Sequence, residues 1–142
     1  MIMVITLAGC GSSTSDDNTF TVGMECDYAP YNWTTTEAEK SEYAVLIDGS
    51  SNAYCDGYDV KVASEIANAM GKELVVKKIS WDGLIPALNS GEIDAIVAGM
   101  SPTAERKQVI SFSDAYYEDV PVQGIMVKSD SEYANATSLE DF

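Results

Sequence analysis

The sequence contains no histidine, and it has only 8 lysines and arginines against 23 aspartates and glutamates. Without histidine the chain cannot form a Ser/His/Asp triad or a Cys/His dyad, and most types of zinc site are excluded. The formal net charge of -15 repels phosphate backbones, so nucleic acid is not expected as a partner. There is no CxxC pair, and neither a metal nor another cofactor is predicted. What remains is a chain of 142 residues, 46% of them hydrophobic, which suits one compact domain with its own core.

The N-terminal stretch MIMVITLAGCGSSTSDDN joins a short apolar run to small residues, a cysteine and a polar tract. It resembles a bacterial lipoprotein signal, with Leu7, Ala8 and Gly9 as the lipobox and Cys10 as the acylated residue. Only nine residues precede Cys10 and none is charged, so we expect the true signal to start further upstream. The alternative is an ordinary buried strand. The prediction is a signal remnant at 1–9, then a lipidated cysteine and flexible tether at 10–19.

Cys26 and Cys55 remain as an even pair once Cys10 is assigned to lipid. In an exported, oxidising setting such a pair predicts a disulfide. Closing the loop between them would stabilise the fold by about 3.5 kcal/mol in the chain-entropy estimate. The alternative is two free buried thiols.

Strand patterns recur along the rest of the chain. Residues 19–24 (TFTVGM) and 73–79 (ELVVKKI) are predicted strands, and residues 43–54 (YAVLIDGSSNAY) are a predicted hairpin. The near-continuous apolar run at 93–99 (IDAIVAG) is typical of a strand covered on both faces. A further strand is predicted at 121–128 (PVQGIMVK).

Helical patterns lie between these strands. In the first helix Asp59 is the predicted N-cap and Gly71 the residue that ends it; in the second, Asp82 and Gly91 take these places. The predicted apolar stripe of the first helix consists of Val62, Ala63, Ile66, Ala67 and Met70. A third helix is expected from about Thr103. Alternating strands and helices predict an α/β fold with a parallel sheet, in which ligands bind beyond the carboxyl ends of the strands.

The stretch AGMSPTAERK at 98–107 lies at one of these ends. Gly99 allows close approach of a ligand to the main chain, and Ser101 and Thr103 offer hydroxyls. Arg106 falls on the same side of the first helical turn as Thr103 and can bind a carboxylate in a bidentate manner. These residues predict a carboxylate clamp. The alternative is that Thr103 only caps the helix while Arg106 pairs with a surface acid such as Glu105 or Asp114.

Four segments resemble, in their sequence and in their order along the chain, the family 3 periplasmic-type solute-binding proteins, which deliver polar amino acids to ABC importers. They are DYAPYNW, GYDVKVASEIANAMGKEL, WDGLIPALNSGEIDAIVAGMSPTAERK and ISFSDAYY. The resemblance covers residues 20 to 142. It implies a periplasmic binding protein-like type II fold, with residues 20–142 as lobe 1, a parallel-rich sheet flanked by helices. Family members continue for about as much chain again. The resemblance therefore implies that lobe 1 ends near the first hinge crossover and that the binding site is incomplete.

The resemblance also implies roles for individual residues. Arg106 and Ser101 are similar to the groups that hold the ligand α-carboxylate, and Gly99 to the position whose carbonyl accepts the α-ammonium. Trp81 and Tyr28 match aromatic walls, although the first can also be core and the second can cover the sheet edge. Glu25 matches an acidic position near the ligand, although it can also be a solvated loop acid. Asp59 and Asp94 are read as a cap and a structural acid.

The implied function is capture of a polar or cationic amino acid by two closing lobes, without enzyme activity. The expected partners are the free amino acid, the permease subunits of an ABC importer, and the membrane through lipid on Cys10. The expected location is extracytoplasmic. Two other readings share this architecture. One is an amino-acid-sensing ectodomain, and the other is a dehydratase in which Glu25 is the acid or base.

Overall fold

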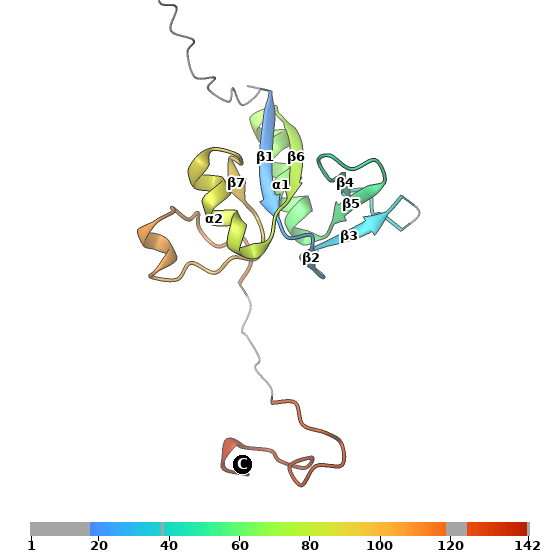
Figure 1. The fold of residues 1–142 in the computed structure, drawn as a ribbon, viewed down its shortest axis with the longest axis vertical. Helices are drawn as coiled ribbons and strands as arrows, with labels where there is room; N and C mark the ends of the chain where they lie inside the picture. The colour runs from blue at the N-terminus through green and yellow to red at the C-terminus, as the bar shows by residue number, and fades with distance from the viewer. Residues whose placement is uncertain (1–17, 38, 119–124, 142) are drawn as a thin grey trace, which may run out of the picture. The chain divides into compact units, whose positions relative to one another are not determined.

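A parallel sheet of β1 (Thr19–Met24), β6 (Glu73–Lys78) and β7 (Ala95–Ile96) forms the centre of the first part of the chain (Figure 1). The computed structural model describes residues 18–37, 39–118 and 125–141. The strand order is β6-β1-β7, and β1 is parallel to both neighbours. The predicted α/β class and parallel sheet are therefore confirmed. The third strand has only two residues, so the predicted strand at 93–99 is much shorter than expected.

The helices α1 (Tyr58–Met70) and α2 (Trp81–Ser90) cover opposite faces of this sheet (Figure 1). Successive residues of a strand point to opposite faces, and β1 follows this rule. Val22 lies in the same hydrophobic cluster as the buried apolar side chains of α1. A Cβ added to the next residue, Gly23, would meet Leu84 of α2 at 3.0 Å. Both faces are thus covered, as parallel strands require.

The predicted C-terminal glycines are confirmed, whereas the predicted N-caps are wrong. Gly71 and Gly91 both adopt the left-handed conformation that ends a helix. The N-cap residues are Gly57 and Ser80, and neither Asp59 nor Asp82 is a cap. Each aspartate is instead the second residue of its helix, where its charge still favours the helix dipole.

The buried stripe of α1 also differs from the prediction. Val60, Ala63 and Ala67 are buried, whereas Ile66 and Met70 are 39% and 52% exposed. The buried side chains pack with those of β1, β6 and a further strand, β5 (Ala53–Asp56), in one hydrophobic cluster. Its members are Phe20, Val22, Met24, Cys26, Ile47, Cys55, Val60, Ala63, Ala67, Val76 and Val97.

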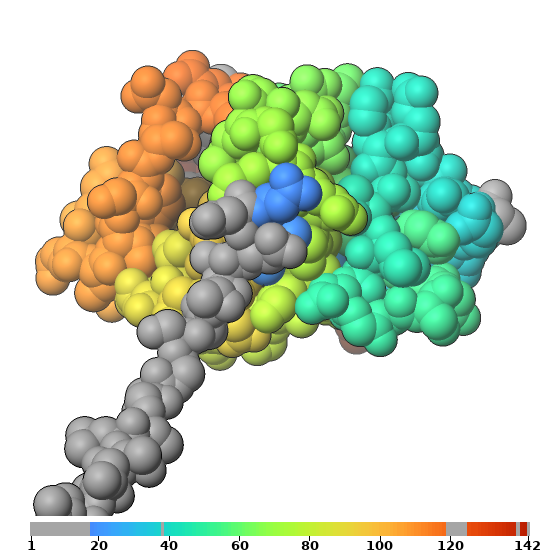
Figure 2. Space-filling view, turned by 90° about the horizontal axis from the view of Figure 1, so that it is seen from above, coloured from blue at the N-terminus to red at the C-terminus, as the bar shows by residue number. Residues whose placement is uncertain are grey.

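A second, antiparallel sheet lies beside α1 and β6 (Figure 2). Its strand order is β2-β3-β5-β4, and a bridge between Ile47 and Val76 joins it to β6. The pairing of β4 with β5 confirms the predicted hairpin at 43–54. The strands are β2 (Asp27–Tyr28), β3 (Asn32–Thr36), β4 (Val45–Leu46) and β5 (Ala53–Asp56).

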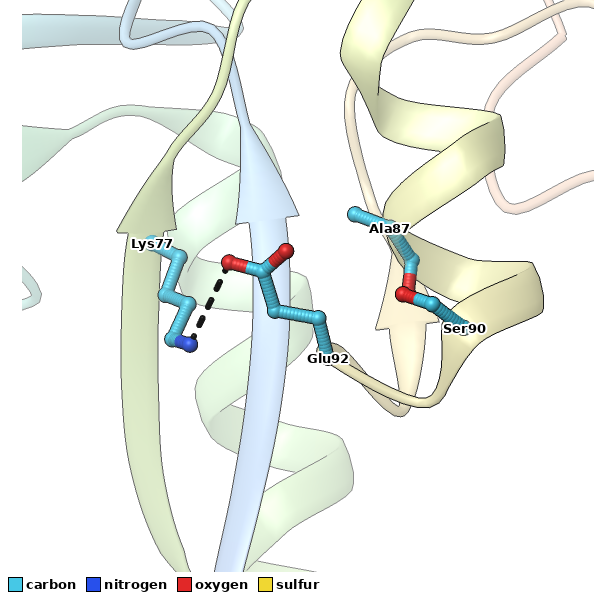
Figure 3. A network of polar contacts seen from close by, with 4 residues as sticks. All are labelled: Lys77, Ala87, Ser90 and Glu92. Atoms are coloured by element: carbon cyan, nitrogen blue, oxygen red, sulfur yellow. Dashed lines mark hydrogen bonds and ion pairs between the residues drawn. The ribbon is translucent and has the colours of Figure 1, made fainter. Parts of the chain in front are cut away.

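An ion pair links β6 to the loop between α2 and β7. Lys77 Nζ lies 3.5 Å from Glu92 Oε1, as Figure 3 shows. At the end of α2, the Ser90 hydroxyl donates a hydrogen bond to the carbonyl of Ala87 at 3.0 Å. Since both members of the ion pair are solvent-accessible, its contribution to stability is at most about 1 kcal/mol.

Residues 113–142 form a separate unit by their contacts. In its described part, the predicted strand at 121–128 is not found over residues 125–128, and residues 121–124 lie outside the described residues. A short 3-10 helix, η2, spans Leu139–Asp141. The amides of Thr137 and Ser138 donate to Asp141 Oδ2 at 2.7 and 2.8 Å, and these bonds lower the pKa of Asp141 below its ordinary value.

Within the described part of the chain, no helix combines the length and the apolar character that crossing a bilayer requires.

Candidate functional site

The predicted ligand-binding residues follow the carboxyl ends of the three parallel strands. Glu25 comes directly after β1, Trp81 begins α2 beyond β6, and Gly99 follows β7. In an open parallel sheet, ligands bind in the crevice beyond these ends. The strand order β6-β1-β7 brings the three segments to the same edge of the sheet.

Arg106 is half-buried and is held by two neighbours. Its Nη1 donates a hydrogen bond to the backbone carbonyl of Ser101 at 3.0 Å, and its Cζ lies 5.2 Å from the ring centroid of Trp81. Its backbone amide donates to Thr103 Oγ1 at 3.2 Å. The ion pairs found in the described part of the chain do not include Arg106. The guanidinium is therefore positioned by a carbonyl and an aromatic ring rather than by an acid.

The helix predicted from about Thr103 is wrong. The structure has a single 3-10 helix there, η1 (Arg106–Gln108), and residues 101–105 and 107–109 are all exposed. A helix in a protein is stabilised mainly by an apolar face that packs on the core, and this segment has none. The charge that can attract an anion at this place is accordingly that of the arginine, without a helix dipole.

Tyr28 lies against Gly99 at the other side of the site. A Cβ added to Gly99 would lie 3.3 Å from Cε1 of the Tyr28 ring, and Gly99 has a φ of +61° that other residues rarely adopt. The ring of Tyr28 also stacks on that of Tyr31, with centroids 5.1 Å apart and an interplanar angle of 22°. Tyr28 remains 50% exposed, so its ring still has area to offer a ligand.

The backbone from Gly99 to Ser101 joins these two groups of contacts. Two Cα–Cα steps of about 3.8 Å separate the residue that Tyr28 covers from the residue that holds Arg106. An arginine fork carries five N–H donors, and the bond to Ser101 uses one of them, which leaves donors for a carboxylate. A cation, a nearby carbonyl and aromatic walls at one edge suit a zwitterion of small size.

Glu25 is half-buried beside this site, but none of the contacts just described includes it. Cys10 lies outside the described residues, so its lipidation stays a prediction. In the described ranges, no cluster of three or more Cys, Asp and Glu side chains could hold a metal ion.

Cys26 and Cys55 are both buried free thiols in the structure, so the predicted disulfide is not formed there. The two residues are nevertheless neighbours. A hydrogen bond to Cys26, followed by burial, raises the pKa of the Cys55 thiol far above its ordinary value. Cys55 Sγ also lies 4.0 Å from Met24 Sδ. Neither side chain is among the contacts of the candidate site described above, and both belong to the core.

Sequence reasoning missed the polar residues around the backbone of Cys26. Asn32, Thr34 and Lys78 bond to the backbone of Cys26 or to one another. Tyr31, which stacks on Tyr28, was missed as well. The aromatic pair in DYAPYNW was visible in the sequence. The polar contacts were not, because they join β3 to Cys26, which lies between β1 and β2, and to Lys78 of β6, and they carry no local signal.

Comparison with known proteins identifies the family. The family model of the bacterial extracellular solute-binding proteins, family 3, matches residues 20–139. The arginine-binding extracellular protein ArtP of Bacillus subtilis (strain 168) is 33% identical over an alignment of 115 positions, which covers 78% of this chain and 39% of that protein. The ABC transporter glutamine-binding protein GlnH of the same strain is 31% identical over an alignment of 149 positions, which covers 98% of this chain and 52% of that protein.

Solved structures agree with this result. The arginine-bound form of domain 1 from TmArgBP has a TM-score of 0.57 and 33% identity, covering 76% of this chain and 74% of that one. An ancestral arginine-binding protein bound to arginine has a TM-score of 0.56 and 37% identity, covering 71% of this chain and 38% of that one. The chain thus spans about half or less of the full-length relatives, but most of a single domain. This chain belongs to the bacterial extracellular solute-binding proteins, family 3.

Proposed function

We propose that the described fold is one lobe of an extracytoplasmic binding protein that captures a free polar or cationic amino acid for an ABC importer. Arg106 and Ser101 hold the α-carboxylate, the carbonyl of Gly99 accepts the α-ammonium, and Trp81 and Tyr28 pack on the rest of the ligand. A second lobe closes over the ligand and selects the closed state. The protein binds and does not catalyse.

The observation that carries this proposal is the state of Arg106. Its guanidinium stands over Trp81 and bonds to the Ser101 carbonyl, and it has no acid as a partner among the described residues. In a chain with a net charge of -15, a cation left without a carboxylate partner at the end of a parallel sheet is set to receive one from a ligand.

The ligand class is argued from charge and from relatives. The negative field of the chain favours a ligand with a cationic side chain, and Glu25 lies beside the site. Relatives whose names state arginine binding support the same class, and the arginine-bound domain 1 from TmArgBP supports the idea that a single lobe holds a ligand. L-arginine is therefore the first ligand to test.

The test is calorimetric titration of the chain with L-arginine and with agmatine, which is arginine without its carboxylate. L-arginine should bind and agmatine should not, because the clamp acts on the carboxylate. Arg106→Ala should weaken L-arginine binding by about 100-fold, since two charge-assisted hydrogen bonds are lost. Lys107→Ala is the matched control, because it removes the neighbouring exposed cation and should change little. Equal binding of both ligands, or unchanged affinity in Arg106→Ala, would refute the clamp.

The lipid anchor is a separate part of the proposal. We expect the complete gene product to carry acyl chains on Cys10 and to sediment with membranes. Cys10→Ala should release it to the soluble fraction, whereas Cys26→Ala should not. Mass spectrometry of the N-terminal peptide decides the matter, because a peptide that continues unmodified through Cys10 would exclude acylation.

A further inference from the structure

The chain changes direction directly after β1, at Cys26. This residue has a φ of +52°, and it is the non-glycine residue with positive φ among those the structure describes. An L-residue with a side chain rarely holds this conformation unless its surroundings impose it. The Cys26 kink lies between Glu25, which directly follows β1, and β2, which carries Tyr28.

Side chains of β3 hold both polar backbone groups of Cys26. The Cys26 amide donates to Asn32 Oδ1 at 2.9 Å, and the Cys26 carbonyl accepts from Thr34 Oγ1 at 2.7 Å. Each of these side chains has its own support. Asn32 Nδ2 donates to Asp59 Oδ2 at 2.8 Å, and Lys78 Nζ donates to Thr34 Oγ1 at 2.9 Å. The kink is thus clamped from α1 on one side and from β6 on the other.

The two clamps differ in their surroundings. Asn32 and Asp59 are 1% and 0% exposed, so their bond belongs to the core. Thr34 and Lys78 are exposed, and neither adds apolar surface to the core cluster. A lysine that donates to a hydroxyl makes that hydroxyl a better donor to the next acceptor. The Thr34 clamp can therefore be removed with little loss of packing, which makes it open to a direct test.

We propose that Thr34 and Lys78 are positioning residues for the amino-acid site: by clamping the Cys26 kink they hold the Tyr28 ring against Gly99. The part of this inference that concerns affinity rests on the proposed function, and the part that concerns geometry does not. Neither residue needs to touch the ligand. They act through Asp27, the one residue that separates the kink from Tyr28.

The geometry has its own readout in the α-proton chemical shifts of glycine. The Tyr28 ring lies against Gly99, so its ring current shifts the α-protons of Gly99. Gly71 and Gly91 have similar φ values of +66° and +75°, but an added Cβ at either would meet nothing within 4 Å. They are internal references for a left-handed glycine without a ring beside it.

The experiment compares Thr34→Val with Thr36→Val in the chain labelled with carbon-13 glycine. Both threonines are exposed and lie two residues apart on the same face of β3, so the second is a matched control. Thr34→Val should move the Gly99 α-proton shifts toward those of Gly71 and Gly91 and lower the affinity for L-arginine by about five-fold, the effect of one hydrogen bond. Thr36→Val should change neither.

Two more variants keep the inference open to refutation if Thr34→Val does not fold. Lys78→Met should change the chemical shifts of the Gly99 α-protons in the same direction as Thr34→Val does. Cys26→Gly should leave these chemical shifts as they are in the unaltered chain, because glycine adopts the kink without strain. The inference would be overturned if the Gly99 α-proton chemical shifts were unchanged in both Thr34→Val and Lys78→Met. It would also be overturned if they moved toward those of Gly71 and Gly91 in Cys26→Gly. If the unaltered chain binds no amino acid, the proposed function fails, and the Gly99 shifts still decide whether the clamp exists.

Discussion

Replacing Asp59 by alanine should destabilise the fold far more than replacing its counterpart Asp82. Both are the second residue of a helix, so each contributes a negative charge near a helix N-terminus, an effect of about 0.3–1 kcal/mol. Asp82 is exposed and contributes little else. Asp59 is 0% exposed, and its Oδ2 accepts a hydrogen bond at 2.8 Å from Asn32, which is 1% exposed.

The additional loss in Asp59→Ala follows from that burial. Without the carboxylate, the Asn32 amide loses its acceptor in a place that water does not reach, which costs about 1–3 kcal/mol. The expected totals are about 1.5–4 kcal/mol for Asp59→Ala and about 0.3–1 kcal/mol for Asp82→Ala. Asp59→Asn keeps an oxygen acceptor at the same position and should lose less than half as much as Asp59→Ala.

Urea unfolding followed by tryptophan fluorescence measures these differences, provided that the slope of the transition is unchanged. The reasoning would be refuted if Asp59→Ala and Asp82→Ala lost equal stability. It would also be refuted if Asn32→Ala added its full effect to that of Asp59→Ala, because residues that share one hydrogen bond should not be additive.

Three further predictions concern single positions. Gly99→Ala and Gly91→Ala should each lose about 1–2 kcal/mol of stability, because both glycines have a positive φ. Only Gly99→Ala should weaken L-arginine binding, since the added methyl meets the Tyr28 ring. Equal affinities of the two variants in a titration would contradict this. Iodoacetamide should label Cys26 and Cys55 in urea but not in the folded chain, because both are buried and the pKa of the Cys55 thiol is raised. If the two cysteines resisted labelling in urea until a reductant was added, they would instead form a disulfide. Asp141 should titrate below its ordinary pKa of 3.8 in a carbon-13 NMR titration. Its contribution to stability is therefore present above that pH and is lost as the pH falls through the lowered pKa. A midpoint at or above 3.8 would contradict the two hydrogen bonds that backbone amides donate to this carboxylate.

Features with a local signal were predictable from the sequence. Alternation predicted β1, and Gly71 and Gly91 predicted where the helices end, because a left-handed helix end requires glycine in most cases. The helix starts were less predictable. An aspartate at a helix start has the same appearance in the sequence whether it caps the helix or follows the cap, and Asp59 follows the cap and accepts a hydrogen bond from Asn32.

The region after β7 shows the opposite balance. Its predicted helix became a single 3-10 turn, since residues 101–105 and 107–109 are all exposed and offer no buried face. Its predicted long strand became a two-residue strand, although Ile93, Val97 and Ala98 are buried. The contact of Arg106 with Trp81 was nevertheless within reach of the sequence argument. The carboxyl ends of parallel strands lie at one edge of the sheet whatever the length of the elements that follow, so residues after neighbouring strands are expected to come close together.

The Cys26 kink lay beyond that argument, and the reason bears on how stability and binding are divided in this fold. Most of the core cluster lies on β1, β5, β6 and α1, whereas Gly99 and Ser101 are exposed. Substitutions in the exposed group should change affinity with little effect on folding, apart from the conformational strain at Gly99. The kink joins the two groups, because its thiol is part of the core and its backbone sets the path to Tyr28. Substitutions that disturb Cys26 or its clamps should therefore change stability and affinity together, in proportions that depend on whether the altered partner is buried, as Asn32 is, or exposed, as Thr34 is.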